Sequence, residues 1–432
     1  RRNAPQLVRA LPFVVPAYTW WSRPYYGAGL MLYSLMAGSL GLGFSRLIGR
    51  TQALRLAPTL EPSGLRGGVV YYDGQFDDAR LAMTLMRTVQ DCGGVPLNYM
   101  PVTGLSKEGG KVRGVTARDS ETGEELTLRA RVVVNATGVS TDRVRRMDDP
   151  AAQTMLSLSQ GIHLVLDRSF LPGDHAIMIP KTADGRVLFA IPWHNRTVVG
   201  TTDTPVTEAL LEPRPLAEEI AFLLAHAAKY LSKNPAPEDV LSMYAGLRPL
   251  VTGSGGDGST ASLSREHTLL VSRAGLVTIT GGKWTTYRHM AKATVDKAIK
   301  VGGLRKASCR TRNLRLHGYQ EQPEPEPFGV YGSDAPALKQ LLAEQPGWDQ
   351  QLHSNLPYRV GEVVWAARHE SARTVEDFLA RRTRAIVLDA RASQEIAPRV
   401  AELLAGELGF DRGWEQAQVQ QYVELAQGYR LT

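Results

Sequence analysis

Cysteine is almost absent from this sequence, and so is any grouping of residues that would bind a metal ion. The 432 residues include two cysteines, Cys92 and Cys309, which lie far apart and outside any cluster of Cys or His. This pattern excludes a disulfide-stapled extracellular scaffold and a structural zinc site. It favours a reducing, cytoplasmic compartment, and we expect no metal ion.

Several motifs of catalysis and binding are also missing. The sequence has no Walker loop, no Ser-His-Asp arrangement and no internal repeat. The glycines near the N-terminus do not follow a strand in the Gly-x-Gly-x-x-Gly spacing of a dinucleotide site. Because no Lys/Arg-rich tract or RNP-type aromatic motif occurs, we do not expect nucleic acid as a partner.

The charge is modest but unevenly distributed. The chain has 50 Lys and Arg against 43 Asp and Glu, a net charge of +7. Residues 328–432 carry 11 Lys or Arg and 14 Asp or Glu, a net charge of −3, which leaves +10 for residues 1–327. A basic body of this kind suits phosphorylated small molecules or acidic lipid surfaces.

Residues 24–45 form the one long stretch without a charged side chain. Its length would satisfy a membrane-spanning helix, which needs about 20 residues. However, five glycines, two serines and three tyrosines within residues 25–44 dilute its apolar character. We therefore predict a buried or interfacial helix. The flanking Trp20, Trp21, Arg23 and Arg46 would suit a membrane surface.

Hydrophobic periodicity predicts an α+β chain. A strand at 69–72 and a turn at Asp73-Gly74 precede a helix that begins at Asp77 or Asp78 and stops near Gly93. The apolar run Val132-Val133-Val134 is typical of a strand covered on both faces. Further strands are expected at 95–102, 111–118, 125–135, 244–250, 268–272 and 276–280. Residues 161–203 should form an antiparallel region with a turn at 194–196. Helices are expected at 216–231 and 285–301, and a Gly/Ser loop at 253–260.

The composition divides the chain into two domains. Residues 321–327 read Glu-Gln-Pro-Glu-Pro-Glu-Pro, which is typical of a stiff, solvated linker. Residues 1–320 are mixed α/β, and residues 328–432 follow an all-helical pattern. The sequence therefore predicts a large α+β domain followed by a helical C-terminal domain.

The strongest local signal lies at residues 276–288. A strand runs into Gly281-Gly282 and then into a helix whose first turn carries Lys283, Thr285 and Thr286. Glycines allow the backbone to approach a ligand, and a helix start offers free N–H groups with partial positive charge. The pattern indicates a site for an anion, or for a ring that becomes anionic on reduction. A purely structural helix entry is the alternative.

Two further residues are candidates on chemical grounds. Arg248 lies between apolar residues of a strand, where a guanidinium needs a paired anion, either an internal carboxylate or a substrate phosphate. His163 begins an apolar strand, where it is either a structural histidine or a general base for a substrate hydroxyl. His194 in a turn and His289 in a helix are weaker candidates.

Eight short segments occur in a distinctive order along the chain. They are Tyr-Tyr-Asp-Gly-Gln-Phe-Asp-Asp-Ala-Arg-Leu (71–81), Ala-Arg-Val-Val-Val-Asn-Ala-Thr-Gly (130–138), Gly-Thr-Thr-Asp (200–203), Gly-Leu-Arg-Pro-Leu (246–250), Ser-Arg-Glu-His (264–267), Gly-Gly-Lys-Trp-Thr-Thr-Tyr-Arg (281–288), Leu-Ala-Arg-Arg-Thr-Arg (379–384) and Leu-Asp-Ala-Arg-Ala (388–392). Together they resemble the FAD-dependent glycerol-3-phosphate dehydrogenases of the aerobic respiratory type, over essentially the whole chain.

The resemblance implies a Rossmann-like FAD-binding domain interleaved with an antiparallel substrate domain, both within residues 1–320, and a helical cap domain at 328–432. It also implies that FAD is the cofactor. The positions that match the family's cofactor-binding residues are Asn135, Ala136, Thr137, Gly138, Gly281, Gly282, Lys283, Trp284, Thr285 and Thr286.

The resemblance further implies roles in catalysis. Arg248, Lys283 and Thr285 match positions at the substrate, with Arg248 and Lys283 holding its phosphate, and His163 matches the base on the C2 hydroxyl. The expected reaction oxidises sn-glycerol 3-phosphate to dihydroxyacetone phosphate by hydride transfer to FAD, and a quinone receives the electrons. A peripheral position on the cytoplasmic face of the inner membrane and a homodimer are compatible with it. The alternative is a related FAD-dependent 2-hydroxy acid or amine oxidoreductase.

One departure from the family concerns the N-terminus. The sequence opens with Arg1-Arg2-Asn3, downstream of the strand, Gly-rich turn and helix that cradle the FAD pyrophosphate in family members. We therefore expect residues 1–432 alone to bind FAD poorly and to be inactive. The sequence is then either a truncated form of an enzyme or, if the truncation is genuine, a non-catalytic remnant.

Overall fold

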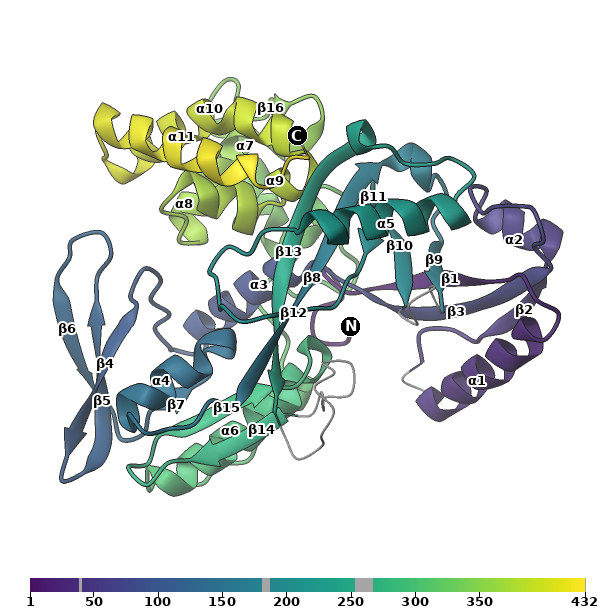
Figure 1. Cartoon of the computed structure of the whole chain (residues 1–432). Helices are drawn as coiled ribbons and strands as arrows, with labels where there is room; N and C mark the ends of the chain where they lie inside the picture. Colours follow the sequence, from purple (N-terminus) through teal and green to yellow (C-terminus); the bar gives the residue numbers. More distant parts are fainter. Residues whose placement is uncertain (39–40, 181–186, 253–266, 432) are drawn as a thin grey trace.

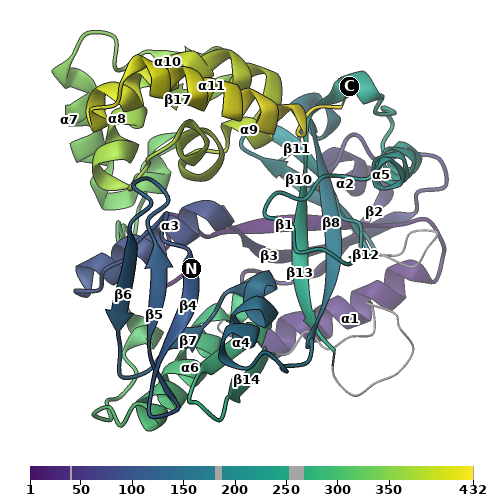
Figure 2. The same ribbon diagram turned by 60° about the vertical axis from the view of Figure 1, so that its left-hand side comes forward.

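The computed structural model describes residues 1–38, 41–180, 187–252 and 267–431. Its elements form a large central sheet, a smaller parallel-containing sheet with its helices, and a C-terminal group of helices (Figures 1 and 2). In both views the long strands β8 (Leu156–Asp167) and β13 (Val240–Val251) run from the C-terminal helices toward β15 (Val277–Gly281) and α6 (Tyr287–Val301). These two strands therefore connect all three parts.

The central sheet is mostly antiparallel and follows the order β12-β8-β11-β10-β9-β1-β3-β2. A further strand, β13, lies outside this order and pairs with β8. One face is buried under α2 (Arg50–Leu56) and α5 (Ala217–Tyr230), where Ile162, Leu164 and Leu223 form part of the core. The remaining strands are β1 (Arg9–Ala17), β2 (Arg46–Gly49), β3 (Gly67–Gln75), β9 (Ala176–Ile179), β10 (Leu188–Trp193), β11 (Arg196–Gly200) and β12 (Thr204–Val206).

The smaller sheet has the order β14-β15-β7, in which β15 and β7 are parallel. A separate three-stranded sheet extends from it and reaches the C-terminal domain through a bidentate ion pair between Glu121 and Arg373. The elements of this part are α3 (Asp78–Asp91), β4 (Val102–Glu108), β5 (Lys111–Arg118), β6 (Glu125–Arg129), β7 (Val134–Asn135), α4 (Thr141–Asp148) and β14 (His267–Val271).

The C-terminal domain packs its helices onto the other end of the central sheet. Val165 of β8 and Val198 of β11 share one apolar cluster with Phe378, Ile386 and Val400. The elements are α7 (Ala335–Glu344), β16 (Gln351–His353), β17 (Leu356–Arg359), α8 (Val360–His369), a π-helical turn (Asp377–Arg382), α9 (Ala385–Leu388), α10 (Ala390–Leu408) and α11 (Arg412–Gln427). The all-helical prediction was therefore wrong at the short β16–β17 hairpin.

Predictions that depended on local signals are confirmed. Asp77 caps α3, accepting hydrogen bonds from the N–H groups of Ala79 and Arg80, and the helix ends two residues before Gly93. β5 covers residues 111–118 as predicted, and α5, α6, β14 and β15 fall within two residues of their expected bounds. The predicted loop at 253–260 and most of the segment 264–267 lie outside the described residues.

Two strand predictions and one turn prediction were wrong, and each error concerns a partner strand. Residues 95–101 form no strand, because Pro96 and Pro101 lack N–H donors, although the carbonyls of Tyr99 and Pro101 accept backbone hydrogen bonds from Ser120 and Arg118. The predicted strand at 125–135 divides into β6 and β7, which belong to different sheets, and Val134 is 41% exposed, not covered. Asp73-Gly74 continues β3 instead of turning, because β1 pairs with both residues.

Residues 24–45 include most of α1 (Ser22–Ala37), which is not a buried helix. Its buried residues are Ser22, Gly27 and Ser34, whereas Leu35 and Met36 are 71% and 79% exposed. Within the described parts of the chain, no helix combines the length and apolarity needed to cross a bilayer. The buried alternative is therefore wrong, and an apolar surface remains to be explained.

Candidate active site

The two candidate residues His163 and Arg248 lie on one face of the β8–β13 pair. The antiparallel register places His163 opposite Tyr244, Gly161 opposite Gly246, and Ser159 opposite Arg248. Because side chains alternate across a strand with a period of two, these three pairs share a face. The structure thus brings together two residues that are widely separated in sequence, with a pair of glycines between them.

The His163 ring is held between two neighbouring strands. It stacks on the Tyr244 ring with a centroid separation of 5.0 Å, and a methyl group on Gly200 of β11 would lie 2.2 Å from its Cδ2 atom. Burial of the ring and the positive charge of Arg248 lower the pKa of His163 to about 4. His163 is therefore a neutral imidazole at physiological pH, the form that accepts a proton.

The guanidinium of Arg248 folds back over Gly161. Its Nη2 atom donates to Thr201 Oγ1 and to the Thr202 carbonyl, both at 3.2 Å, and Nη1 lies 3.5 Å from Asp203 Oδ1. The internal carboxylate considered for this arginine is therefore present, but Arg248 remains about one-third exposed, at 32%. Asp203 orients the guanidinium, and a partly exposed cation remains on the same face as His163.

A buried hydrogen-bond network fixes the segment that contacts Arg248. The Thr202 hydroxyl donates to Glu219 of α5 at 2.8 Å and accepts the Ile162 N–H at 3.0 Å. Gln160 and Thr204 donate to the same carboxylate. Glu219 is 3% exposed, so α5 anchors residues 201–204 from the opposite face of the sheet.

The second candidate group lies at the end of the parallel strands β7 and β15. Thr278 of β15 pairs with Asn135 of β7, so Asn135–Gly138 and Gly281–Thr286 leave the same edge of the sheet. In sheets of this kind ligands bind outside the carboxyl ends of the strands. The two segments proposed to contact a cofactor are therefore adjacent in space.

This edge fits a flat, partly anionic cofactor. Gly138, Gly281 and Gly282 have φ values of +56°, +72° and +74°, in the left-handed region that favours glycine. Lys283, Thr285 and Thr286 are exposed immediately before α6. A cation, two hydroxyls and a helix N-terminus form a donor set suited to negative charge.

Three of these residues also have structural partners. The side chain of Asn135 is buried, donates to the Thr141 carbonyl and accepts the Thr137 hydroxyl. A methyl group on Gly282 would lie 2.5 Å from the Met290 sulfur. Trp284 packs against the rings of Phe76 and Tyr287. Because the Asn135 side chain already has both of these partners, a cofactor contact at Asn135 would involve its backbone.

Lys283 and Thr285 are not brought into bonding contact with Arg248. Both residues follow β15, which neighbours β13. Within the described part of the chain, no hydrogen bond or ion pair joins either of them to Arg248. No group of three Cys, His, Asp or Glu side chains able to hold a metal ion occurs among the described residues.

Sequence reasoning missed the residues that surround the two candidates. Thr201, Asp203 and Tyr244 contact Arg248 or His163, and Gly161 and Gly200 make room for them. One available signal was the alternation of Tyr244, Gly246 and Arg248, which places all three on one face. The partner strand that carries His163 could not be found in this way, because strand register is not a local property.

The fold and the two adjacent sites define a class of protein. The end of the parallel strands, where the candidate cofactor-binding segments lie, adjoins the antiparallel sheet that carries His163 and Arg248, and this arrangement suits a cofactor-dependent oxidoreductase. Residues 9–288 match the family described as FAD dependent oxidoreductase, and residues 277–418 match the C-terminal domain of alpha-glycerophosphate oxidase.

Individual proteins agree with this class. The chain is 37% identical to the mitochondrial glycerol-3-phosphate dehydrogenase of Macaca fascicularis, covering 99% of this chain and 63% of that protein. It is also 37% identical to that of Arabidopsis thaliana, covering 99% and 74%. The structure of glycerol-3-phosphate dehydrogenase from Bacillus halodurans, complexed with FAD, superposes with a TM-score of 0.83 at 27% identity, covering 100% of this chain and 84% of that one.

The chain therefore belongs to the FAD-dependent oxidoreductase family, in the branch of the glycerol-3-phosphate dehydrogenases. Its cofactor is FAD. The chain spans less than two thirds of the length of the macaque relative, at 63%.

Proposed function

We propose that the enzyme to which this chain belongs oxidises sn-glycerol 3-phosphate to dihydroxyacetone phosphate, with FAD as hydride acceptor and a quinone as electron acceptor. The observation that carries the proposal is the shared face of His163 and Arg248, separated by the Gly161–Gly246 pair. A proton acceptor and an anion-binding cation lie there on paired strands, four positions apart in the register. The names of the relatives support the choice of substrate.

Each residue has a distinct role in this proposal. Arg248 binds the substrate phosphate through its planar fork of donors, and Asp203 keeps it aimed at that face. The neutral His163 takes the proton of the C2 hydroxyl. Lys283 and Thr285 add a cation and a hydroxyl from the neighbouring loop.

The chain's own residues also account for cofactor binding. Asn135–Gly138 and Gly281–Thr286 would hold FAD at the common edge of β7 and β15. Bound FAD supplies the electron sink for the oxidation.

We propose that the chain divides into a first domain of residues 1–320, a linker of residues 321–327 and a C-terminal domain of residues 328–432. The substrate sheet is inserted in the first domain.

The proposal is tested by Arg248→Gln in the full-length, FAD-loaded protein. We expect KM for glycerol 3-phosphate to rise about 10- to 100-fold, because a hydrogen bond to a charged group contributes about 1.5–3 kcal/mol. Dye reduction with glycerol 3-phosphate and with a 2-hydroxy acid measures both specificity and KM. A higher kcat/KM for the 2-hydroxy acid, or an unchanged KM in the variant, would contradict the proposal.

The two facing glycines offer a matched test of the space around Arg248. In Gly161→Ala the new methyl group would lie 2.2 Å from Arg248 Nη2 and 2.6 Å from Thr201 Oγ1. We expect this variant to displace the guanidinium and raise KM about tenfold or more. In Gly246→Ala the methyl group meets no protein atom within 4 Å, so the guanidinium keeps its position and KM should rise much less. Equal effects of the two substitutions would show that Arg248 does not set substrate affinity.

We further propose that α1 lies on a membrane surface, on the cytoplasmic face of the inner membrane, where an apolar quinone is accessible. Tyr26 and Leu30 pack on the sheet beside Phe13 and Tyr71, while the outer side of the helix exposes apolar side chains. An apolar face flanked by arginines suits anionic lipids. The exposed residues of this surface are Trp20, Trp21, Tyr25, Met31, Leu32, Tyr33, Leu35, Met36 and Phe44.

Vesicle sedimentation tests this surface. We expect Leu35→Glu/Met36→Glu to lower binding to vesicles containing anionic lipid at least about tenfold, because burying each side chain contributes about 1.5–3 kcal/mol. The matched control is Leu210→Glu/Leu211→Glu, which changes two leucines that are 50% and 100% exposed elsewhere on the molecule. Equal losses in both variants would exclude a specific role of α1.

A further inference from the structure

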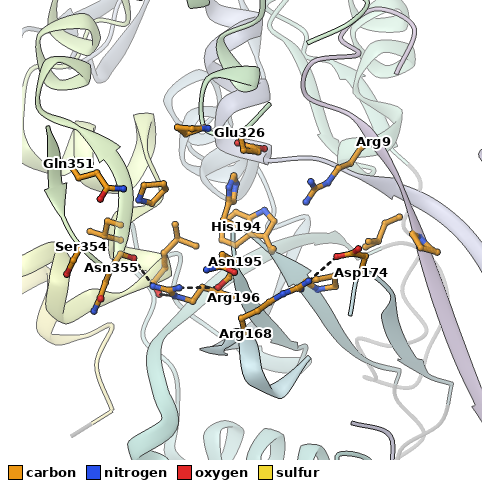
Figure 3. Close-up of a pocket in the computed structure, with 18 of the residues that line it drawn as sticks. Arg9, Arg168, Asp174, His194, Asn195, Arg196, Glu326, Gln351, Ser354 and Asn355 are labelled. Carbon is orange, nitrogen blue, oxygen red and sulfur yellow. Dashed lines mark hydrogen bonds and ion pairs between the residues drawn. The ribbon is translucent and has the colours of Figure 1, made fainter. Parts of the chain in front are cut away.

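A cavity of about 650 Å³ lies at the junction of the central sheet and the C-terminal domain. It is lined by β1, the β10–β11 turn, the linker and the β16–β17 hairpin, and no residue of the His163–Arg248 face contributes to it (Figure 3). Arg9 approaches from one side and Gln351, Ser354 and Asn355 from the other, with His194 between them. We propose that this cavity binds a small metabolite that carries a phosphate or carboxylate group, held between Arg9, Arg168 and Arg196.

The charges of the lining favour an anion. Three arginines line the cavity against two acids, Asp174 and Glu326. Arg9 and Arg196 form no ion pair with a carboxylate among the described residues; Arg9 donates to the Gln75 amide oxygen at 2.8 Å. Arg9 has no carboxylate partner among the described residues, and Arg196 interacts with a carboxylate, that of Asp167, without forming an ion pair, so the two guanidinium groups leave a positive potential that attracts oxyanions.

The third arginine can change partners at little cost. Arg168 pairs with Asp174 at 3.0 Å, but the Asp174 side chain is 96% exposed. Such exposed pairs are weak in water because both groups remain hydrated. A ligand oxyanion inside the cavity would therefore compete effectively for the Arg168 guanidinium.

The turn in the middle of the cavity is held in an unusual conformation. Trp193 pairs with Arg196, so His194 and Asn195 form a two-residue hairpin loop, with φ values of +44° and +57°. This turn type normally has glycine in at least one position. His194 is held there by Asp77, 3.6 Å away, and by edge-on contact with the Trp193 ring. Backbone strain of this kind persists where the surroundings fix it, often at ligand clamps.

The cavity spans two domains, which gives a bound ligand a structural effect. Arg196 already joins them, donating from Nη2 to the Asn355 carbonyl at 2.8 Å and from Nε to the Leu388 carbonyl at 3.2 Å. A ligand that contacts Arg9 and Arg168 on the sheet side and Ser354 or Gln351 on the other would stabilise the same contact. Occupancy should therefore raise the thermal stability of the protein.

Titration calorimetry on the FAD-loaded Arg248→Gln protein tests the inference, because that substitution weakens anion binding at the proposed substrate site. The probes are inorganic phosphate and citrate. We expect at least one of them to bind at a single saturable site with a Kd of about 1 mM or tighter and to raise Tm. The probe that binds more tightly identifies the phosphate or the carboxylate class of ligand.

Two further substitutions in the same protein locate the site. Arg9→Gln/Arg168→Gln changes two arginines that are not buried, so folding should persist, and it should weaken probe binding about tenfold or more. Arg305→Gln, at an exposed arginine beyond α6, is the matched control and should leave binding unchanged. The absence of saturable binding of both probes, or equal binding by the double variant and the control, would overturn the inference. Neither result bears on substrate oxidation, which the wild-type protein reports separately.

Discussion

Replacing His163 with asparagine should lower kcat about 10²- to 10⁴-fold, the range by which a positioned general base accelerates a reaction. Asparagine is smaller than histidine and keeps a polar group beside Tyr244, but its amide cannot accept the substrate proton. KM should change much less, because the substrate phosphate is held by Arg248. Steady-state dye reduction with glycerol 3-phosphate measures both constants.

The pH dependence gives this prediction a second readout. Because burial and the charge of Arg248 lower the pKa of His163 to about 4, the ring stays neutral at higher pH. Wild-type activity should therefore be lost as the pH falls through about 4, and not near the ordinary histidine pKa of about 6.5. His353→Asn, at an outer pair with Glu395, should leave kcat and the profile unchanged. A His163→Asn enzyme that retains wild-type kcat would rule out this base.

Removing the Arg80 side chain charge should have the largest effect on stability. Arg80 of α3 forms a bidentate pair with Glu370 of the C-terminal domain, at 2.8 and 2.9 Å, and the two side chains are 8% and 1% exposed. Its guanidinium also lies 4.8 Å from the centre of the Tyr331 ring. Arg80→Met leaves the Glu370 carboxylate buried without its cation, so we expect a loss of about 3–5 kcal/mol in chemical unfolding.

A more exposed ion pair, which also joins the large domain to the C-terminal domain, provides the control. Arg373 and Glu121 are also bidentate, at 2.8 and 2.6 Å, but their side chains are 31% and 35% exposed. Arg373→Ala should therefore cost about 1 kcal/mol or less, because both groups regain hydration. Similar losses in Arg80→Met and Arg373→Ala would show that burial of the Arg80–Glu370 pair does not determine its contribution.

The candidate site was predictable from the sequence only in part. The residue types of His163, Arg248 and Lys283 restricted the chemistry, and the motifs indicated the family. The contacts of Arg248 with Thr201 and Asp203 were not predictable, because they depend on how residues 201–203 are held by Glu219 of a distant helix. The cavity around His194 was missed for the same reason, since it is formed by segments far apart in the chain.

The sequence by itself determined features that depend on neighbouring residues. Asp77 caps α3, Gly281 and Gly282 allow the turn before α6, and apolar periodicity sets α5 and β5. The physical reason is that caps, turns and amphipathic faces depend on groups within a few positions of one another.

Tertiary structure decided everything that needs a partner strand or a partner domain. Residues 95–101 remain outside any sheet, 125–135 divides between two sheets, and β3 continues through Asp73-Gly74 because β1 lies beside it. The same register places His163 and Arg248 on one face, and domain packing gives Arg80 its partner Glu370. Backbone hydrogen bonds and buried charges are satisfied by whichever group lies opposite in space, and distance along the chain does not specify that group.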